Sequence, residues 1–289
     1  MTIRRRAVAM EPSTAITAVI ICRDGGVGLR AALDSVAFCA ERLVLDSGST
    51  DGSPDVARAA GARVEFQPFL GYGPQKRRAV ALATHDWILS LDADEHLDAA
   101  AVAAISGLPL DDPEVAYALR RRTFVGRREI HHGPWGGERV VRLFNRRTAD
   151  FALLPVHEQV RAPHAPVPLG GSILHDSFPS IGDVLVRSVR YARPKAAMIR
   201  ATGERPRAWA LPGRALGAFA KAYLLQSGWR DGTAGLVIAV ARVVDSVLPR
   251  AMILLGEEDA GQDCRAAANS PAMSAGSGAA RSSRTPDRG

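Results

Sequence analysis

The chain contains 289 residues, of which 47% are hydrophobic, and it carries a formal net charge of +7. This length and composition exclude a wholly disordered chain, and they suffice for one sizeable α/β domain with appendages. The positive charge is almost entirely arginine and indicates an anionic partner such as a nucleotide diphosphate or a membrane surface. We expect no nucleic-acid binding, because the aromatic residues do not lie among the basic runs.

Short apolar segments alternate with helical patterns in the first third of the chain. Strands are predicted over 16–22, 42–45, 63–66 and 87–91, and helices over 29–39, 55–60 and 75–83. Ser53 is the predicted cap of the second helix and Pro54 its first residue. This alternation predicts right-handed crossovers and a parallel sheet.

Acidic loops follow three of these strands. They contain Asp24, then Asp46 to Asp51, and then Asp92 to Glu95. Open α/β sheets bind ligands beyond the carboxyl ends of their strands, so we expect these loops to converge on one rim of the sheet.

The pattern changes beyond residue 115. Extended segments are predicted over 117–124, 139–144, 153–161 and 172–175, and helices over 181–202, 214–227 and 233–256. The last helix is apolar but interrupted by Arg242, Asp245 and Pro249, and an Ala-, Gly-, Ser- and Arg-rich tail follows it. We therefore divide the chain into a flexible N-terminus (1–15), an α/β domain (16–180), a helical region (181–256) and a disordered tail (257–289).

The remaining features of the sequence favour a cytoplasmic setting. The three cysteines, Cys22, Cys39 and Cys264, lie far apart and predict neither a disulfide framework nor a zinc cluster. No uninterrupted apolar stretch follows the basic N-terminus, so we expect no signal peptide. No segment is apolar for long enough to predict a transmembrane helix.

Asp92 and Asp94 flank one alanine directly after the strand predicted over 87–91. Mg²⁺ takes oxygen ligands, typically one or two carboxylates together with substrate phosphates. Such an ion neutralises charge that grows on a departing diphosphate. An Asp-X-Asp tripeptide by itself is usually a solvated loop, but its place at the end of a strand favours a binding site for a metal and a nucleotide.

The loop from Asp46 to Gly52 allows two interpretations. Ser, Thr, Asp and Gly are the residues that a capped strand-to-helix turn requires. Alternatively, Asp46 at the end of the strand contacts a ring N–H or a ribose hydroxyl of a nucleotide. Both hold if Thr50 and Ser53 shape the turn while Asp46 binds the ligand.

Several segments together resemble family 2 glycosyltransferases of the GT-A fold, and within them the lipopolysaccharide-core β-1,4-glucosyltransferase-like subgroup. The segments are Cys22–Gly25, Leu45–Gly52, Gly71–Arg77, Leu89–Glu95, His132–Trp135, Glu138, Arg142–Phe144, Val156–Glu158 and Leu174–His175. Asp24-Gly25 stands where these enzymes commonly have Asn-Glu, and Glu138 stands where they have aspartate. The resemblance implies a Rossmann-like, mostly parallel sheet flanked by helices, followed here by a C-terminal helical extension.

The resemblance also implies an activity, and it makes 16–180 the catalytic domain, with a donor half (16–97) and an acceptor half (98–180). The enzyme would transfer a sugar from a nucleotide sugar, a UDP-hexose, to a hydroxyl of a glycolipid or cell-envelope glycan, with inversion. Asp94 and His175 would hold Mg²⁺ or Mn²⁺, and Asp24, Asp46, Asp51, Lys76 and Asp92 would contact the nucleotide sugar. The base that takes the acceptor proton would be Glu138 or Glu158.

Structural alternatives exist for several of these residues. Glu138 could pair with Arg139 or Arg142, Glu158 could belong to a hydrogen-bond network, and His175 could be purely structural. Lys76 could lie on a solvated helix face. Trp135 could stack on a sugar ring or pack in the core.

The segment 209–255 combines aromatic and leucine side chains with flanking arginine and lysine. This composition suits a helix that lies in a membrane interface, and ordinary packing against the catalytic domain is the alternative. We therefore expect the protein at the inner face of the cell membrane as a peripheral protein. The rival functions are a sugar nucleotidyltransferase and a non-catalytic carbohydrate- or membrane-binding scaffold.

Overall fold

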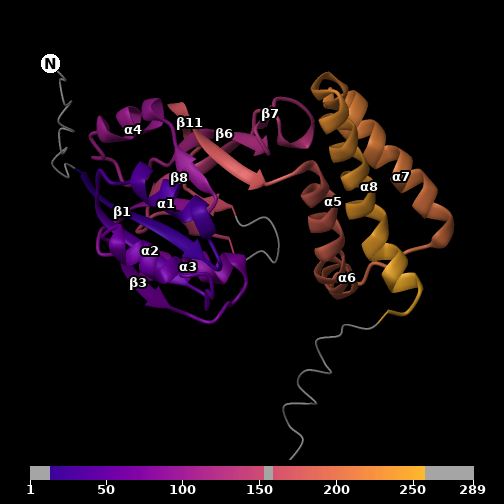
Figure 1. The fold of residues 1–289 in the computed structure, drawn as a ribbon, viewed down its shortest axis with the longest axis horizontal. Helices are drawn as coiled ribbons and strands as arrows, with labels where there is room; N and C mark the ends of the chain where they lie inside the picture. The colour runs from indigo at the N-terminus through magenta and orange to yellow at the C-terminus, as the bar shows by residue number, and fades with distance from the viewer. Residues whose placement is uncertain (1–13, 153–158, 258–289) are drawn as a thin grey trace, which may run out of the picture.

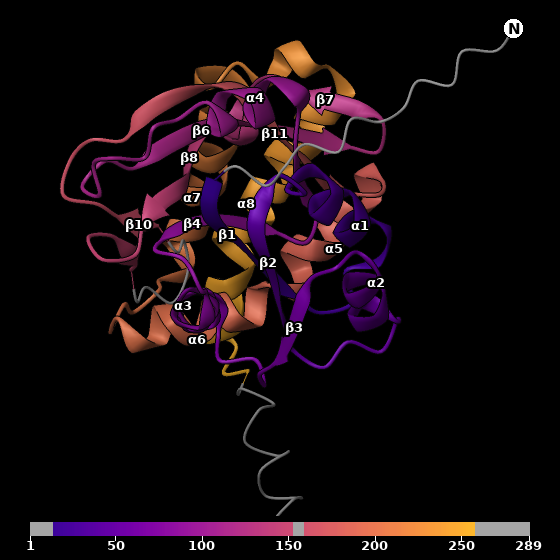
Figure 2. The same cartoon turned by 90° about the vertical axis from the view of Figure 1, so that its left-hand side faces the viewer.

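The computed structural model describes residues 14–152 and 159–257. Within these ranges, a nine-stranded sheet forms the body of the molecule, and the C-terminal helices pack beside it as a further layer (Figure 1). Figure 2 shows the molecule after a 90° turn, with α1 (Gly26–Ser35) and α2 (Ser53–Ala59) on one side of the first strands and α3 (Tyr72–Leu82) on the other. The predicted α/β class with a C-terminal helical extension is confirmed.

The remaining elements follow in chain order. The strands are β1 (Thr14–Cys22), β2 (Cys39–Asp46), β3 (Arg63–Phe66), β4 (Trp87–Asp92), β5 (Glu95–Leu97), β6 (Tyr117–Val125), β7 (Arg128–Ile130), β8 (Arg139–Asn145), β9 (Asp150–Phe151), β10 (Val160–Arg161) and β11 (Val167–Phe178). The later helices are α4 (Ala99–Ser106), α5 (Ile181–Arg190), α6 (Ala192–Ala201), α7 (Leu211–Phe219) and α8 (Thr233–Leu254). Short helical turns are η1 (Gly133–Trp135), η2 (Ala208–Ala210), the π-helical η3 (Ala220–Leu225) and η4 (Gly228–Asp231).

The strands lie in the order β3-β2-β1-β4-β8-β6-β11-β5, with β7 paired to β6. The pairs among β3, β2, β1 and β4 are parallel, as the alternation of strands and helices predicts. In contrast, β8 is antiparallel to both β4 and β6, and β5 is antiparallel to β11. The expected parallel sheet therefore describes the N-terminal half. The other half is mixed because β6, β7 and β8 follow one another without the crossover helix that a parallel pairing needs.

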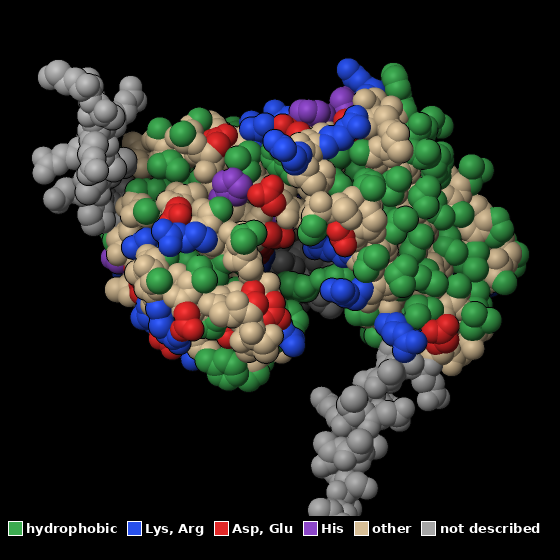
Figure 3. Space-filling view, viewed as in Figure 1, with side chains coloured by type: hydrophobic (Ala, Val, Ile, Leu, Met, Phe, Trp, Pro, Cys, Tyr) green, Lys and Arg blue, Asp and Glu red, His purple; other side chains and the backbone are tan. Residues whose placement is uncertain are grey.

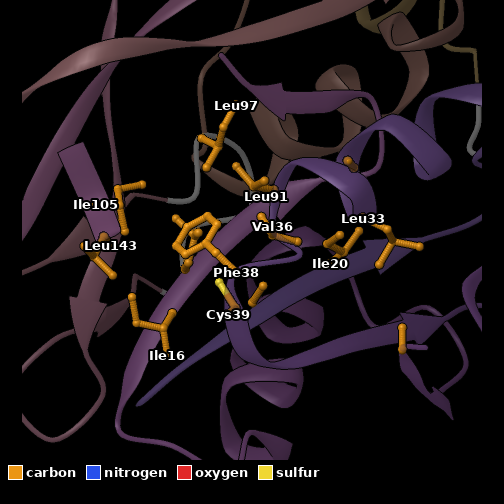
Figure 4. Packing of buried hydrophobic residues seen from close by; sticks show 14 of the residues in the cluster. Ile16, Ile20, Leu33, Val36, Phe38, Cys39, Leu91, Leu97, Ile105 and Leu143 are labelled. Atoms are coloured by element: carbon orange, nitrogen blue, oxygen red, sulfur yellow. The ribbon is translucent and has the colours of Figure 1, made fainter. Parts of the chain in front are cut away.

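Both faces of the parallel strands are buried. Ile16 and Ile20 of β1 pack with Leu33 of α1 in the largest core cluster (Figure 4). Val19, which points to the opposite face, packs with Ala79 of α3 in a second cluster. Successive side chains of a strand alternate between faces, so a strand that is covered on both faces has a continuous apolar sequence. This arrangement explains the apolar segment from which the first strand was predicted.

The starts of the first three helices differ from the prediction, and α1 begins at Gly26 and not at residue 29. Gly52, not Ser53, precedes α2, and its φ of +80° is in the left-handed region that glycine adopts without strain. Ser53 is therefore the first residue of the helix and Pro54 the second. The third helix begins at Tyr72, directly after Gly71 (φ +99°), which is earlier than predicted.

The C-terminal helices form a layer against the end of the sheet. The segment predicted as one helix over 181–202 is divided into α5 and α6 at Tyr191. Helix α8 continues through Pro249, although a proline removes one backbone hydrogen bond. Val184 of α5 and Ile238 of α8 pack with Phe178 of β11, and this cluster joins the helices to the sheet. None of the helices in the described ranges is long and apolar enough to cross a membrane.

Candidate active site

The carboxyl ends of β1, β2 and β4 lie side by side at one rim of the sheet. In the register of the parallel pairs, Cys22 is opposite Asp46, and Ile21 is opposite Asp92. The loops that follow these strands therefore emerge together. The predicted convergence of the acidic loops on one rim is confirmed, and this is the edge at which open α/β sheets bind ligands.

The carboxylate of Asp46 is bonded to its own loop. It accepts hydrogen bonds from the amides of Gly48 (2.9 Å) and Ser49 (3.1 Å) and from the Ser49 hydroxyl (2.5 Å). The side chain is buried, with 6% of the residue exposed. The turn interpretation of this loop is therefore correct, and the contact between Asp46 and a nucleotide stays a prediction.

Hydrogen bonds join the loops after β1 and β2. The amide of Asp24 donates to Ser49 Oγ (2.8 Å), and the Asp24 carboxylate accepts from the amide of Thr50 (2.7 Å). Asp24 itself has a φ of +52°, a left-handed conformation that aspartate tolerates better than most residues. The two loops thus form one connected surface at the rim.

Asp51 contributes to the same connection from the protein surface. Its carboxylate accepts from the amide of Gly26 (2.9 Å) and from the hydroxyl of Ser53 (2.5 Å). The hydrogen bonds from Ser53 lower the pKa of Asp51, and the bond from Gly26 acts in the same direction. The two oxygens of Asp51 thus hold the loops together.

A cavity of about 1150 Å³ opens at this rim, between the sheet and α5, and the surface is hollowed there (Figure 3). Its wall includes Cys22, Arg23, Asp24, Ser47, Lys76, Asp92 and Asp94 from the donor half, Arg121, Glu138, Arg142, Arg161 and His175 from the later strands, and Arg187 and Tyr191 near the end of α5. Asp46 and Asp51 are not part of this wall. The cavity thus brings most of the predicted site residues together.

Asp92 lies in a network of buried charges. Its Oδ1 is 2.8 Å from Lys76 Nζ, and its Oδ2 is 3.1 Å from an Arg142 nitrogen. The same nitrogen is 2.6 Å from Glu95, which is fully buried. Burial raises the pKa of Asp92, but the charges of Lys76 and Arg142 outweigh it and hold this pKa well below the usual range. Lys76 is 2% exposed, so the alternative of a solvated helix face is wrong.

Asp94 and His175 lie next to each other at the cavity wall. Strand β11 pairs with β5 so that His175 is opposite Glu95, and His175 Nε2 lies 3.3 Å from Asp94 Oδ2. The Asp94 side chain is 44% exposed, in contrast to the buried Lys76 beside Asp92. Across residues 14–152 and 159–257, no group of three or more His, Cys, Asp and Glu side chains could hold a metal ion. Two protein ligands suit Mg²⁺, which usually completes its coordination with water and substrate phosphates.

Glu138 lies directly before β8 and lines the cavity. Its carboxylate forms an ion pair with Arg121 of β6, and the Arg121 amide donates to the Glu138 carbonyl (2.8 Å). The partner is therefore Arg121, and neither Arg139 nor Arg142. With 45% of its side chain exposed, Glu138 remains accessible from the cavity. Glu158, the other candidate base, lies outside the described residues.

Trp135 is part of the packing beneath the helical extension. Its ring stacks on Phe178, with centroids 5.1 Å apart and an interplanar angle of 19°. It packs against the cluster that joins the sheet to α5 and α8, and it does not line the cavity. The core-packing alternative therefore describes Trp135, and sugar stacking does not.

The sequence did not predict the buried ionic network around Asp92. Glu95 directly follows the Asp-X-Asp segment, and Arg142 begins the Arg-Leu-Phe segment that carries the resemblance. Both residues were therefore visible in the motifs. Their pairing depends on how β5 and β8 lie in the sheet, and periodicity does not reveal that.

The chain matches the sequence profile described as "Glycosyl transferase family 2" over residues 17–163, which is more than half of its length. It is 29% identical over 263 residues to the lipopolysaccharide core biosynthesis glycosyltransferase LpsC of Rhizobium meliloti (strain 1021). That alignment covers 84% of this chain and 93% of LpsC.

Among solved structures, the chain is similar to glucosyl-3-phosphoglycerate synthase from Mycobacterium tuberculosis. The complex with Mn²⁺, UDP and glucosyl-3-phosphoglycerate matches with a TM-score of 0.40 and 19% identity, over 72% of this chain and 88% of that chain. The complex with Mn²⁺, UDP-glucose and phosphoglyceric acid matches with a TM-score of 0.31 and 24% identity, over 43% of this chain. In this second match the chain spans about half of the solved structure, 49%.

The profile match runs from within β1 to just past β10, and so includes every loop of the rim and the Asp-X-Asp segment. The parallel strands with the acidic rim are the part of the sheet that the GT-A resemblance predicts. That fold class and the resemblance to lipopolysaccharide-core glycosyltransferases are both confirmed. The chain belongs to glycosyl transferase family 2.

Proposed function

We propose that this enzyme transfers a hexose from a UDP-linked donor to a hydroxyl of a glycolipid or cell-envelope glycan, with inversion at the anomeric carbon. The observation that carries the proposal is the contrast between Asp92 and Asp94. Asp92 is neutralised by Lys76 and Arg142, whereas Asp94 lines the same cavity with 44% of its side chain exposed. The Asp92 carboxylate is thus a structural part of the site, and the Asp94 carboxylate is accessible to a ligand.

Asp94 and His175 would hold the Mg²⁺ or Mn²⁺ of this site. Their oxygen and nitrogen atoms lie 3.3 Å apart and face one cavity, so one ion can contact both with small adjustments of the side chains. When bound, the ion would supply positive charge next to the diphosphate that leaves. The nucleotide sugar would contact Lys76 and Asp92, and also Asp24 at the other side of the rim. We keep Asp46 and Asp51 as candidates that act through the shape of the loops.

Glu138 is the base in this proposal. As the acceptor hydroxyl attacks the anomeric carbon, its proton passes to the Glu138 carboxylate while the bond to UDP breaks on the opposite face. The ion pair with Arg121 holds the carboxylate at the cavity wall. Glu158 remains the alternative base. This assignment fits the division of the chain into a donor half (16–97) and an acceptor half (98–180). Asp94 belongs to the donor half and Glu138 to the acceptor half, and both line the cavity.

An envelope glycan acceptor is supported by the similarity to LpsC, whose name places it in lipopolysaccharide core biosynthesis. A membrane contact is supported by the surface of the helical extension (181–256). Apolar side chains gather over α7 and α8 in Figure 3, and the exposed ones include Trp209, Leu216, Leu224, Leu225, Trp229, Leu236 and Val240.

Basic residues alternate with these apolar residues along the sequence. Arg207, Arg214, Lys221 and Arg230 are all exposed in the same segment. An apolar surface with tryptophan and basic side chains suits the interface of an anionic bilayer. We propose peripheral binding at the cytoplasmic face of the membrane.

The test is turnover of individual UDP-sugars with Mg²⁺ or Mn²⁺, measured as release of UDP. We expect slow release with one UDP-hexose, and a fall of about a hundredfold or more in Asp94→Asn and in Glu138→Gln. Asp34→Asn is the matched control, because Asp34 is an exposed aspartate that pairs with Arg30 on α1. If no UDP-sugar binds or turns over, or if Asp94→Asn behaves like Asp34→Asn, the proposed function is wrong.

A further inference from the structure

Asp231 connects the helical extension to the loop that leads into Glu138. Its side chain lies at the end of η4 and is 5% exposed. The carboxylate accepts from the amide of His132 (2.8 Å), lies 3.2 Å from the His132 ring nitrogen Nδ1, and receives a longer bond from the amide of His131 (3.4 Å). A buried carboxylate from the C-terminal part thus satisfies donors from the segment between β7 and β8.

The same loop is held at two further points. The amide of Gly133 donates to the carbonyl of Gln226 (2.8 Å), which lies in the turn before η4. Trp135 stacks on Phe178 below it. The loop is therefore attached to the helical extension through backbone, side-chain and aromatic contacts.

The fixed part of the loop ends two residues before Glu138, whose other contact is with Arg121. Gly136 packs so closely on the start of the loop that a Cβ atom there would be 2.3 Å from the His131 carbonyl oxygen. The loop thus closes on itself between His131 and Gly136, and Glu138 follows two residues later. A shift of the His131–His132 backbone would move Gly136, and with it the Glu138 carboxylate.

The element that carries Asp231 is itself tightly packed. A Cβ atom at Gly235, in the first turn of α8, would lie 1.8 Å from the carbonyl oxygen of Gly228 and 3.4 Å from the Cβ of Asp231. Only glycine at position 235 allows η4 to pack this closely on α8. Asp231 therefore has a fixed position relative to the long C-terminal helix.

We propose that Asp231 is a positioning residue for the transfer reaction: from the helical extension it holds the His131–Gly136 loop and, through that loop, the carboxylate of Glu138. This inference depends on the proposed role of Glu138 as the base. It assigns a function to the His-Gly-Pro-Trp segment, which fixes the loop and does not touch the sugar. The C-terminal helices would then help to position the base.

The experiment measures hydrolysis of UDP-glucose with Mn²⁺ by the full chain, in which water takes the place of the acceptor. Asp231→Ala removes the carboxylate and leaves two amides without it, and Asp231→Asn keeps the size of the side chain but removes its charge. We expect kcat to fall by about ten- to a hundredfold in Asp231→Ala, the cost of a small misplacement, with a smaller fall in Asp231→Asn. The KM for UDP-glucose should stay within about twofold, because Asp231 touches no residue of the donor half.

Asp245→Asn is the matched control for loss of stability. Asp245 is also a largely buried aspartate of the extension, and it pairs with Lys195 (2.6 Å) and Arg242 (3.0 Å) without touching the loop. We expect this variant to lower the melting temperature about as much as Asp231→Asn, and to leave kcat unchanged. Combining Asp231→Asn with Glu138→Gln should reduce kcat no further than Glu138→Gln alone, because both changes act on one group.

The outcomes separate the two proposals. If Glu138→Gln lowers kcat and Asp231→Asn and Asp231→Ala do not, the positioning role is wrong and the proposed base stands. If Asp231→Asn and Asp245→Asn lower kcat equally, the effect is one of general stability and the positioning role is wrong as well. If Glu138→Gln leaves kcat unchanged, the proposed base itself is wrong.

Discussion

Lys76 Nζ lies 2.8 Å from Asp92 Oδ1, and this ion pair connects α3 to the end of β4 at the floor of the cavity. The lysine is almost completely buried and also lies 5.6 Å from the centre of the Phe151 ring. Because Arg142 contacts the other carboxylate oxygen, Asp92 carries its charge at every pH at which the protein is expected to work. The first aspartate of the Asp-X-Asp segment is therefore a fixed charge that shapes the site.

Replacing Lys76 tests this structural role. In Lys76→Met the half-buried Asp92 carboxylate loses the ion pair with the buried Lys76, and truncating one side of such a pair costs about 3 kcal/mol of unfolding free energy. Urea denaturation at neutral pH measures the loss. Arg58→Met, which removes the partner of Asp55 in an exposed pair, should cost less than about 0.5 kcal/mol. Equal losses in the two variants would contradict the burial argument.

The Glu41 carboxyl should make the unfolding free energy of the protein depend on pH. Burial raises its pKa, but hydrogen bonds from Thr17, Thr84 and Arg63 outweigh this and lower it from 4.5 to about 2. A carboxyl with a lowered folded-state pKa stabilises the protein fully above its unfolded value, and this contribution is lost as the pH falls from about 4.5 toward 2.

The matching experiment compares the wild type with Glu41→Gln. At pH 7 the variant should be less stable, by up to about 3 kcal/mol, and the difference should narrow as the pH falls from about 5 to 2. Urea denaturation at several pH values gives both curves. Asp55→Asn, at an exposed surface pair, should follow the wild type throughout. A difference that stays constant with pH would show that Glu41 does not titrate as described.

Metal removal tests the pair formed by Asp94 and His175. Chelation with EDTA should reduce UDP release to background, and added Mn²⁺ or Mg²⁺ should restore it. In His175→Ala the Kd of Mn²⁺, titrated calorimetrically in the presence of UDP, should rise about tenfold or more. His164→Ala is the control, because His164 lines the same cavity but pairs with Glu114 (3.0 Å). Unchanged Mn²⁺ affinity in His175→Ala would remove His175 from the metal site.

Trp135 should affect stability and not sugar binding. Trp135→Ala removes the ring that stacks on Phe178 and should lower the unfolding free energy by about 3 kcal/mol, the usual lower range for losing a large aromatic side chain. Trp135→Phe keeps a ring there and should recover most of the loss. The KM for UDP-glucose should be the same in both variants. A selective rise in that KM would restore the sugar-stacking interpretation.

The apolar surface of the extension predicts binding to lipid vesicles. Leu216 and Leu224 are 71% and 58% exposed, and their spacing of two helical turns puts them on one side of the α7–η3 helix. Changing both to serine should reduce partitioning onto vesicles that contain phosphatidylglycerol by at least about tenfold. Val27→Ser, at a 94% exposed valine on α1, should have no effect. Equal partitioning of all three proteins, measured by co-sedimentation, would exclude this surface as the membrane contact.

Much of the donor half could be predicted from the sequence, because periodicity and turn residues are local signals. The strand at Arg63–Phe66 has the predicted bounds, and the rim on which Asp24 and Asp92 converge follows from the βα alternation alone. The three-residue strand at Glu95–Leu97 and the π-helical turn at Ala220–Leu225 could not be predicted. Both depend on tertiary packing, since they are too short or too irregular to produce a pattern.

The partners of the site residues were less predictable than the residues themselves. The ion pair between Arg121 and Glu138 depends on the pairing of β6 with β8, which no local pattern fixes. The contact between His132 and Asp231 joins positions 99 residues apart. The Asp46 carboxylate has a local reason for its orientation, because an aspartate at a turn readily accepts from the next amides. A turn was one of the two interpretations of the loop, but this hydrogen bond of Asp46 was not predicted.

The apolar cluster that joins the extension to the sheet has a consequence for any shortened form of the enzyme. A fragment that ends near residue 180 would keep Ile130 and Phe178 but lose Val184 and Ile238, which cover them. It would also leave the His132 amide without the carboxylate of Asp231. Exposed apolar surface favours aggregation, and loss of the hydrogen bond to Asp231 would weaken the loop. We therefore expect soluble expression to require the chain through α8, so that the smallest stable enzyme is considerably longer than the part that contains the catalytic motifs.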